Sequence, residues 1–551
     1  MIQTLDLTIS AFYVGAIFII GLWAGIRHRR KNLYKNEAAN DYFLAGKSLR
    51  WPMIGLALFA TNISCVHLVS LAQSGFDTGL LNGNFEWMAS FTLIILALFF
   101  VPFYMKSRVT TLPDFLEKRY DRASRDWLAF VSVLSAIIIH IAFSLLAGGI
   151  VLETLFGFNL YTSVMVIAII TAIYTIIGGL KAVVITESIQ TIVLISGAVI
   201  MSIASYHKMG GWEPMVQVLK RHNELSMLSM MRPQGDPAGM PWYAVFLGYP
   251  ILGIWYWCAD QTIVQRVLGA KDENNARIGA LFCGFIKILP VFIFVMPGLF
   301  AYTLAQSGKL DVSALTTMQA GKAVVNSKGI YTLMIIQLIP KGLIGVLVAA
   351  LLSGLMSQIS GALNSISTLV SYDIYKRRQP NAKDDALVKV GKIAAGLSLI
   401  LSLALLPLLN HYESIFNGLN DIIAHIAPPI TCVFLLGIFW KGASVHSAKF
   451  TLWIGSAIGV CVFFASKLYP DSVIGHITFM MMAFYLFCGC VFIQVLFSYL
   501  YPDESGIAIA ELTWSSPFEP LKSPGWKGIG NYKFLSVLLL VVMAVLFWIF
   551  R

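Results

Sequence analysis

The sequence predicts an all-α polytopic membrane protein, and three observations predict it. Of its 551 residues, 58% are hydrophobic and only 12% are charged, which is about half the charged share of a soluble globular protein. Stretches of about twenty mostly apolar residues, long enough to cross the hydrocarbon core of a bilayer, recur along the whole chain. Basic residues flank these stretches rather than forming one basic face. The composition therefore excludes an ordinary soluble enzyme, and it also excludes a disordered chain.

The length criterion gives about fourteen candidate transmembrane helices. The longest polar connections between them, at 205–240, 306–337 and 499–533, are too short for an independent soluble core. We therefore expect any function to lie within the helix bundle. The expected spans are 7–26, 52–75, 83–104, 127–155, 160–179, 183–204, 241–265, 278–305, 338–375, 390–408, 413–440, 450–466, 473–498 and 534–550.

The net charge of +11 predicts an orientation rather than a nucleic-acid partner. If the N-terminus lies outside, most of the 39 Lys and Arg residues fall on the inner side, above all in 27–31, 106–125 and 376–378. This is the distribution that the positive-inside rule requires. With an even number of spans, the C-terminus also lies outside. We expect a multi-pass protein of the plasma (inner) membrane that binds no nucleic acid.

Two of the expected spans are interrupted near their middle. The span 52–75 contains Thr61–Ser64, residue types whose side chains compete with the helix for backbone hydrogen bonds. The span 241–265 contains Gly248, Pro250 and Gly253 ahead of three consecutive aromatic residues. Helix breaks within a membrane are tolerated only where they face protein or a watery cavity. Both breaks therefore indicate a binding site.

The interrupted spans are five spans apart, which is the spacing of two five-helix halves related as an inverted repeat. We accordingly expect the first transmembrane helix and a basic cytoplasmic loop in 1–50, followed by the two repeats and their connection. Three peripheral helices with a cytoplasmic loop at about 499–533 complete the chain. The remaining boundaries are 51–204 for the first repeat, 205–240 for an extracellular loop, 241–441 for the second repeat and 442–551 for the peripheral helices.

Ionisable side chains within spans are costly and mark functional sites. Glu86 and Lys287 lie deepest in their expected spans, and His67 follows the first break. A carboxylate and an ammonium group close together neutralise each other and leave acceptors and donors for a hydroxylated ligand. Glu187 and Asp260 lie nearer to span ends, where solvation or helix capping explains them equally well.

The span 338–375 is unusually polar between Ser353 and Gly361. Small residues at four-residue spacing mostly allow helices to pack closely. Hydroxyl and carbonyl oxygens are also the ligands of hard cations, so a sodium site between this span and the break at Ala60–Ile63 is the second interpretation. The residues alone leave both open.

At these positions the chain resembles the solute:sodium symporter family, and within it the sodium/glucose cotransporter branch. The matching pieces follow the family order from about residue 40 to residue 441, and their joint order and spacing make the match specific. They are Asp41–Lys47, Asn62–Ser64, Phe85–Trp87, Gly178–Leu180, Trp255–Gln261 with Gln265–Arg266, Met296–Gly298, Asp373–Tyr375 and Pro428–Pro429 leading to Phe439–Lys441.

The resemblance implies fourteen transmembrane helices around a LeuT-type core of two inverted five-helix repeats, formed by the second to sixth and seventh to eleventh spans. In sugar-transporting members the matching positions bind sugar hydroxyl groups or stack on the sugar ring. Asn62 matches a residue that braces the gating Tyr256. The implied substrate-binding residues are His67, Glu86, Tyr256, Trp257, Lys287 and Asn420.

The resemblance also implies a sodium site. Its ligands would be the backbone carbonyls of Ala60, Ile63 and Gly354 and the Ser357 hydroxyl. Gln358 stands where the family usually has a second serine; its amide oxygen can still coordinate sodium, or its NH₂ group can occupy the site. Glu187 matches an acidic residue near the sodium exit path. Ser144 stands where some members have an aspartate, which favours one sodium per cycle.

We therefore expect a sodium-coupled secondary active symporter that imports a neutral, hexose-like sugar by alternating access. Its expected partners are the sugar, sodium and the lipid bilayer; the oligomeric state is open. A different substrate, such as an inositol, an amino acid or a small anion, is the first alternative. A sodium-independent facilitator or a transport-like sensor is the second, and Gln358 keeps it open. The chain carries no HExxH, CxxC pair, Walker loop or nucleophile elbow, so we do not expect an enzyme.

Overall fold

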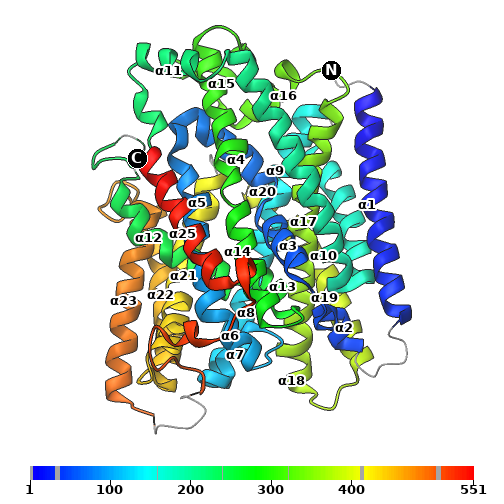
Figure 1. Ribbon diagram of the computed structural model, residues 1–551, viewed down its shortest axis with the longest axis vertical. Helices are drawn as coiled ribbons and strands as arrows, with labels where there is room; N and C mark the ends of the chain where they lie inside the picture. The colour runs from blue at the N-terminus through cyan, green and yellow to red at the C-terminus, as the bar shows by residue number, and fades with distance from the viewer. Residues whose placement is uncertain are drawn as a thin grey trace.

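Helices make up most of the computed structural model, which describes residues 4–31, 38–157, 159–236, 238, 240–319, 322–409, 415–503 and 511–551. Within these residues, eleven helical stretches are long and apolar enough to cross a membrane. Figure 1 shows most of them running along the long axis of the molecule. The prediction of an all-α membrane protein is confirmed. The number of crossings stays a prediction, because some stretches contain two expected spans and others are interrupted.

The helices and the two short strands follow one another along the chain. The first half of the chain contains α1 (Thr4–Lys31), α2 (Ala38–Leu44), α3 (Trp51–Asn62), α4 (Cys65–Thr78), α5 (Gly83–Ile95), α6 (Val101–Lys106), α7 (Leu112–Arg119), α8 (Arg122–Ser135), η4 (Ala136–Ala142), α9 (Phe143–Phe156), α10 (Leu160–Met209), α11 (Trp212–Arg221), α12 (Trp242–Ile254), η6 (Trp255–Ala259) and α13 (Gln261–Leu268). The second half contains α14 (Glu273–Ile286), α15 (Met296–Gln306), the antiparallel pair β1 (Thr316–Gln319) and β2 (Lys322–Val325), α16 (Ile330–Leu338), α17 (Ile344–Leu369), η10 (Val370–Tyr375), α18 (Lys376–Arg378), α19 (Asp384–Ala404), α20 (Leu406–Leu409), α21 (Ile415–Phe439), α22 (Val445–Leu468), α23 (Phe479–Leu500) and α25 (Tyr532–Ile549).

The predicted break in the first interrupted span is confirmed. Helix α3 ends at Asn62 and α4 begins at Cys65, with extended backbone at Ile63 and Ser64. The Ser64 hydroxyl accepts a hydrogen bond from Val66 N at 3.2 Å, and Ser64 N donates to His67 Nδ1 at 3.3 Å. The side chains of the break thus satisfy backbone groups at the start of α4, as capping residues do.

The second interrupted span is also broken, but later than the sequence indicates. Helix α12 continues through Gly248, Pro250 and Gly253, and the chain leaves the helix only at Asp260, after the wider turn of η6. The two glycines instead allow close packing: a Cβ atom on Gly248 would lie 2.3 Å from Met480 O, and one on Gly253 would lie 2.8 Å from the Thr92 side chain. The break at Asp260 is capped, since its carboxylate accepts from Thr262 N at 2.6 Å.

Helix α10 contains two expected spans. Gly179 in its middle has φ 63° and ψ −166°, a conformation that L side chains rarely adopt, and the helix direction changes there. Gly178 packs directly on Gly25 near the end of α1, whereas Asn159, just before α10, lines a groove with Ser10 near the start of α1. The segment 160–179 therefore runs antiparallel to α1.

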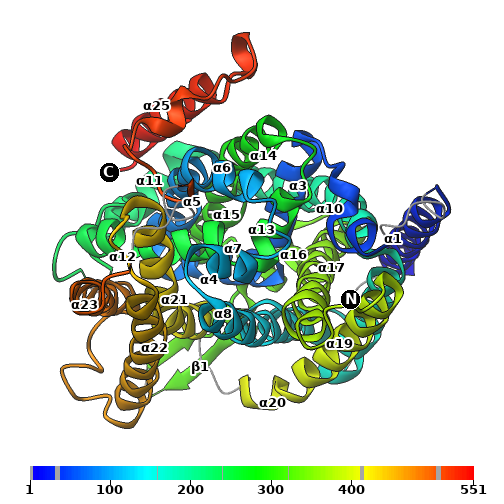
Figure 2. The ribbon, with the colours of Figure 1, turned by 90° about the horizontal axis from the view of Figure 1, so that it is seen from below.

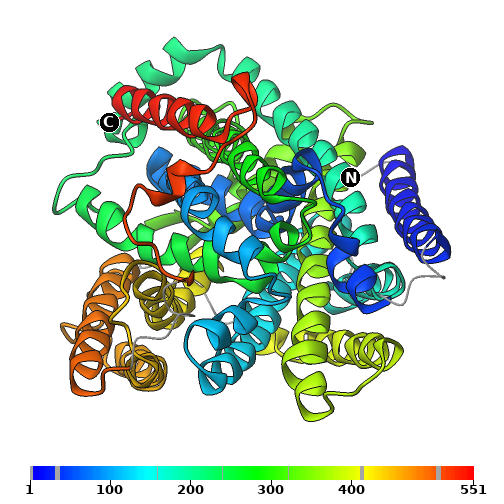
Figure 3. The same cartoon turned by 60° about the horizontal axis from the view of Figure 1, so that its bottom comes forward.

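The helix α17 lies at the centre of the bundle. Within its apolar window 94% of residues are buried, against 28% in the windows of α1, α22 and α25. Figures 2 and 3 show α1, α22, α23 and α25 at the rim, and α4, α13 and α17 further inside. The central position of α17 brings its polar residues next to both helix breaks.

The start of α17 is capped by a residue from another helix. Asp6 of α1 is buried, and its Oδ1 accepts hydrogen bonds from Gly342 N at 3.1 Å and Gly345 N at 2.9 Å. Gly345 lies in the first turn of α17, so its N–H has no partner within that helix, and Gly342 lies just before the helix. A carboxylate there also interacts favourably with the helix dipole.

We expect Asp6→Ala to lower the free energy of unfolding by about 1–2 kcal/mol, the usual effect of losing a helix cap. Asp6→Asn keeps one acceptor oxygen and is expected to lose less than half of that. The measurement is the thermal midpoint of the detergent-solubilised protein. Equal midpoints for wild type and Asp6→Ala would contradict the capping role.

Both ends of the described chain lie on one side of the bundle. Met230 N, in the 205–240 connection, donates to Phe550 O at 2.8 Å, so the end of α25 is held against that connection. The bonds of Asp6 hold α1 against the residues that follow the 306–337 connection. This side is the upper one in Figure 1. Its assignment to the outer face of the membrane stays a prediction.

Candidate functional site

Four residues that the sequence singled out form one hydrogen-bonded group. Glu86 of α5 and Lys287 at the end of α14 make an ion pair, and both are buried, with 2% and 1% of their surface exposed. The Lys287 ammonium also donates to Asn62 Oδ1 at 2.5 Å. Asn62 Nδ2 in turn donates to the Tyr256 hydroxyl at 3.2 Å. The group thus joins α5, α14 and the two broken helices.

His67 completes this group on the side of α4. Its Nδ1 accepts the Ser64 backbone N–H, which leaves Nε2 facing the other way, 4.0 Å from Glu86 Oε1. The helix cap therefore fixes the imidazole ring in an orientation that presents one nitrogen to the carboxylate. A ligand hydroxyl between them would meet both a donor and an acceptor.

A cavity lined by side chains from several helices lies beside this group. Trp257 contributes an aromatic face next to Lys287, whose Nζ lies 5.7 Å from the ring centroid. Tyr256 and Trp257 stand edge to face, with ring centroids 5.3 Å apart. All predicted substrate-binding and gating residues line this one cavity: Asn62, His67, Glu86, Tyr256, Trp257, Lys287 and Asn420.

The cavity also contains residues that the sequence prediction did not assign to a site. Phe85 and Tyr249 add aromatic surface, and His140 and Ser144 come from the helix formed by α8, η4 and α9. A histidine within an apolar span was a detectable signal for His140. The two aromatic residues carry no such signal, because aromatic residues are common throughout membrane helices.

His140 connects α17 with the second helix break. Its Nε2 lies 2.8 Å from Asp260 Oδ2, and its Nδ1 lies 2.6 Å from Gln358 Nε2. Asp260 is 6% exposed, so it is neither solvated nor only a cap. The three side chains form a buried chain of hydrogen bonds along the cavity wall.

The predicted sodium ligands meet where α17 packs on the first helix break. Ser357 Oγ lies 2.9 Å from Ala60 O and 3.1 Å from Gly354 O. In an unbroken helix Ala60 O would accept from the N–H of Ser64, but that N–H is directed to His67. The break therefore frees the Ala60 carbonyl for a partner on α17. Ile63 lies in the extended segment of the same break.

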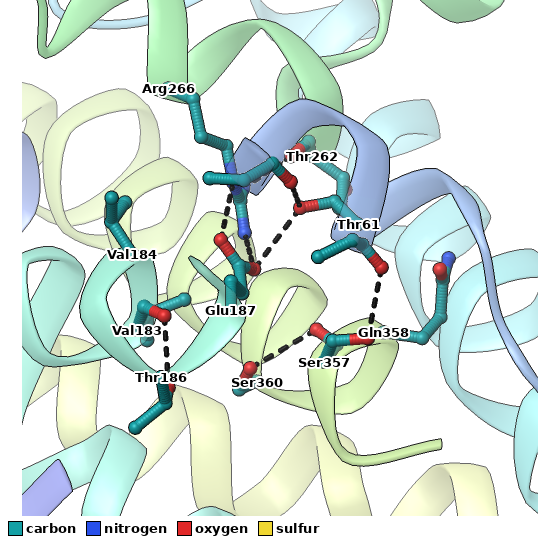
Figure 4. Close-up of polar contacts among 12 residues, drawn as sticks. Thr61, Val183, Val184, Thr186, Glu187, Thr262, Arg266, Ser357, Gln358 and Ser360 are labelled. Atoms are coloured by element: carbon teal, nitrogen blue, oxygen red, sulfur yellow. Dashed lines mark hydrogen bonds and ion pairs between the residues drawn. The ribbon is translucent and has the colours of Figure 1, made fainter. Parts of the chain in front are cut away.

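The close approach of α17 depends on Gly354. A Cβ atom on Gly354 would lie 3.0 Å from the Ser64 carbonyl carbon and 3.1 Å from Cys65 N. Gln358 differs from its neighbour Ser357, since its amide contacts His140 and its side chain extends away from the Ser357 hydroxyl (Figure 4).

Glu187 lies next to Thr61 and is fully buried, which excludes the solvated position that its place near a span end allowed. Its Oε1 lies 2.5 Å from Arg266 Nη2 and accepts from the Thr61 hydroxyl at 3.1 Å (Figure 4). Arg266 is also fully buried, with 0% of its surface accessible. The ion pair ties α10 and α13 to the last turn of α3.

This arrangement suits binding and release rather than chemical conversion. The cavity combines a neutralised charge pair, amide groups and aromatic faces, which are the contacts of a polar, uncharged ligand. The described residues contain no cluster of three or more His, Cys, Asp or Glu side chains that would hold a metal ion. The neighbouring oxygens of Ala60, Gly354 and Ser357 are of the type that binds a hard monovalent cation.

Sequence comparison gives the family. The profile of the sodium:solute symporter family matches residues 42–455. The sodium/mannose cotransporter of Bos taurus is 32% identical over 539 residues, which cover 93% of this chain and 89% of that protein. The sodium/glucose cotransporter 2 of Rattus norvegicus is 33% identical over 494 residues, which cover 85% of this chain and 72% of that protein. Proteins of this family are transporters, so the chain is not an enzyme.

Structural comparison gives the same fold. A Na⁺-coupled sialic acid symporter, solved in a substrate-bound outward-open state, matches with a TM-score of 0.75 at 22% identity, and the match covers 92% of this chain and all of that one. The LeuT-type fold expected from the sequence is confirmed. The motifs that matched in family order, the two broken helices and these comparisons agree. The chain belongs to the sodium:solute symporter family.

Proposed function

We propose that the protein imports a neutral, hexose-like sugar together with sodium by alternating access. The observation that carries the proposal is the buried group of Glu86, Lys287 and Asn62 beside the aromatic faces of Tyr256 and Trp257. Sugars present several hydroxyl groups, each able to donate and accept, together with an apolar ring face. The cavity offers complementary contacts to both.

Charge favours a neutral substrate over the alternatives. A small anion needs an uncompensated cation, but the ammonium of Lys287 is already paired with Glu86 and bonded to Asn62. An amino acid needs one partner for its amine and another for its carboxylate. An inositol shares the hydroxyl chemistry of a sugar, so only a substrate panel separates the two. The mannose and glucose cotransporters among the relatives support a sugar as the substrate.

Sodium is the coupling ion of the family, and we place one sodium per cycle at the carbonyls of Ala60, Ile63 and Gly354 and the Ser357 hydroxyl. An ion there would hold α17 against the broken end of α3, and the same break positions Asn62 and His67 in the sugar cavity. Sodium and sugar would therefore favour the same conformation, which is sufficient for a coupling free energy of about 1–3 kcal/mol.

Tyr256, braced by Asn62, would cover the sugar from the inner side and move for its release. We assign the protein to the plasma membrane with both termini outside. The reason is that basic residues concentrate in the connections on the other side of the membrane from the termini, as the positive-inside rule requires of the inner side. The inward-negative potential then adds about 2.3 kcal/mol per 100 mV for each sodium carried.

The test is uptake of radiolabelled mannose, glucose, galactose and myo-inositol into proteoliposomes. We expect one hexose to accumulate above its external concentration when sodium is present outside. Replacement of sodium by choline should abolish this accumulation. Equal uptake in sodium and in choline would support a sodium-independent facilitator instead. Preferred uptake of myo-inositol would overturn the proposal that the substrate is a sugar.

The sodium site makes a specific prediction. Ser357→Ala removes the one side-chain oxygen that joins the carbonyls of α3 and α17, so we expect the half-saturating sodium concentration to rise at least about tenfold, since one ligand is worth about 1.4 kcal/mol or more. The sugar KM at saturating sodium should change less than threefold. Ser353→Ala, on the preceding turn and bonded to Tyr13 rather than to α3, is the matched control. An unchanged sodium dependence in Ser357→Ala would place the ion elsewhere.

A further inference from the structure

The side chains of Ser357 and Gln358 face different partners. Successive residues on a helix point about 100° apart, and on α17 this rotation directs the Ser357 hydroxyl to Ala60 and the Gln358 amide to His140. Gln358 lines the same cavity as Glu86, Lys287 and Trp257. Its side chain thus belongs to the cavity wall, whereas that of Ser357 belongs to the contact between α17 and α3.

The neighbours of Gln358 determine which end of its amide is bonded to His140. The Asp260 carboxylate only accepts hydrogen bonds, so His140 Nε2, 2.8 Å away, carries the hydrogen. The group 2.6 Å from His140 Nδ1 is the NH₂ of Gln358, which only donates, so Nδ1 is the acceptor. Asp260 is itself held by Thr262 N. This chain of bonds turns the amide oxygen away from His140.

The amide oxygen that results has no hydrogen-bond donor among the described residues. Gln358 Oε1 is buried, and the whole residue is only 4% exposed. Buried acceptors without a donor are rare in folded proteins and point to a missing partner. The NH₂ group is held in place, so the oxygen cannot gain a donor by a simple flip without losing the bond to His140.

We propose that Gln358 is a substrate-binding residue whose Oε1 accepts a hydrogen bond from one hydroxyl group of the transported sugar. The inference rests on the proposed function, because it takes the cavity as the sugar site. His140 and Asp260 act as positioning residues that keep the NH₂ group away from the cavity. Gln358 therefore contributes to the choice of sugar, and the sodium site relies on Ser357 and the three carbonyls.

The experiment compares Gln358→Met with wild type in proteoliposomes. Methionine keeps the length of the side chain and removes the acceptor, so we expect the sugar KM at saturating sodium to rise about tenfold, the effect of one lost hydrogen bond in a buried site. The half-saturating sodium concentration should stay within twofold of wild type. Gln358→Glu keeps an acceptor at the same length and should retain a KM closer to wild type than Gln358→Met does.

Deoxy sugars identify the hydroxyl group. One monodeoxy analogue of the transported hexose should bind wild type about tenfold more weakly than the parent sugar, and Gln358→Met should not distinguish the two, as expected for a pair that interacts directly. Gln190→Met is the matched control. Gln190 is also buried with unpartnered amide atoms, but it lies on α10 and does not line the cavity.

Three outcomes would overturn the proposal. The first is an unchanged sugar KM in Gln358→Met. The second is that each deoxy sugar loses the same binding affinity, relative to the parent sugar, in wild type and in Gln358→Met. The third is a large rise in the half-saturating sodium concentration of Gln358→Met with an unchanged sugar KM. If Gln358→Met fails to fold, Gln358→Asn withdraws the acceptor by one methylene and should raise the KM in the same way. Sodium-independent uptake of sugar by wild type would refute only the coupling of sugar to sodium. The comparison of sugar KM values would still test whether Gln358 binds the sugar.

Discussion

Lys287→Met is expected to lower sugar uptake at least about 100-fold. Each hydrogen bond from a charged group to a substrate is worth about 1.5–3 kcal/mol, and the substitution removes the ammonium and leaves Glu86 buried without its partner. Breaking a buried ion pair in this way also destabilises the fold by about 3–5 kcal/mol. The measurement is initial uptake, normalised to the amount of folded protein.

The double variant Glu86→Gln/Lys287→Met separates these two effects. It contains no unpaired charge, so its thermal stability should return towards that of wild type while uptake stays low. Lys449→Met is the matched control, because Lys449 pairs with Asp121 at 2.8 Å but is 36% exposed, and exposed pairs contribute at most about 1 kcal/mol. Wild-type uptake in the double variant would show that the pair has only a structural role.

Arg266→Met is expected to lower the free energy of unfolding by about 3–5 kcal/mol. Glu187 and Arg266 are both fully buried, and the substitution leaves the carboxylate with only the Thr61 hydroxyl. The readout is the fraction of detergent-solubilised protein that stays monodisperse after heating.

Restoring charge balance should again restore stability. The thermal midpoint of Glu187→Gln/Arg266→Met is therefore expected to be higher than that of Arg266→Met. Arg377→Met is the control, because Arg377 pairs with Asp126 at a position where both side chains are partly exposed. If the single and double variants at the buried pair melt alike, the loss comes from packing of the Arg266 side chain rather than from an unpaired charge.

The charged members of the site were predictable from the sequence alone. Glu86 and Lys287 lie within apolar spans, where an ionisable group needs a partner. Their mutual pairing was proposed from this argument and is present in the structure. The resemblance to the family added Asn62, Tyr256 and Asn420, which composition does not distinguish from other polar and aromatic residues.

The positions of the helix breaks were only partly predictable. Thr61–Ser64 marked the first break correctly, and the Ser64 hydroxyl bonds the backbone of α4 at Val66 N. Gly248, Pro250 and Gly253 suggested the second break too early, since two of these residues serve close packing against α23 and α5. Asp260, the residue at which the helix ends, resembles an ordinary helix cap in the sequence.

The chain of Gln358, His140 and Asp260 was not predictable. The residues come from three elements, and Gln358 and His140 are 218 positions apart in the sequence. Local patterns carry no information about such contacts. The family resemblance suggested sodium for Gln358, whereas the direction of its side chain depends on the partner that the fold places beside it.

Equilibrium binding tests the central claim, that sodium and sugar stabilise the same conformation, most directly. Binding of the transported hexose to purified protein should be measured across sodium concentrations, and binding of sodium across sugar concentrations. Sodium should strengthen sugar binding about 5- to 150-fold, and sugar should strengthen sodium binding by the same factor, because linkage is reciprocal. Ser357→Ala should reduce both factors together. An identical sugar affinity in sodium and in choline would contradict the account.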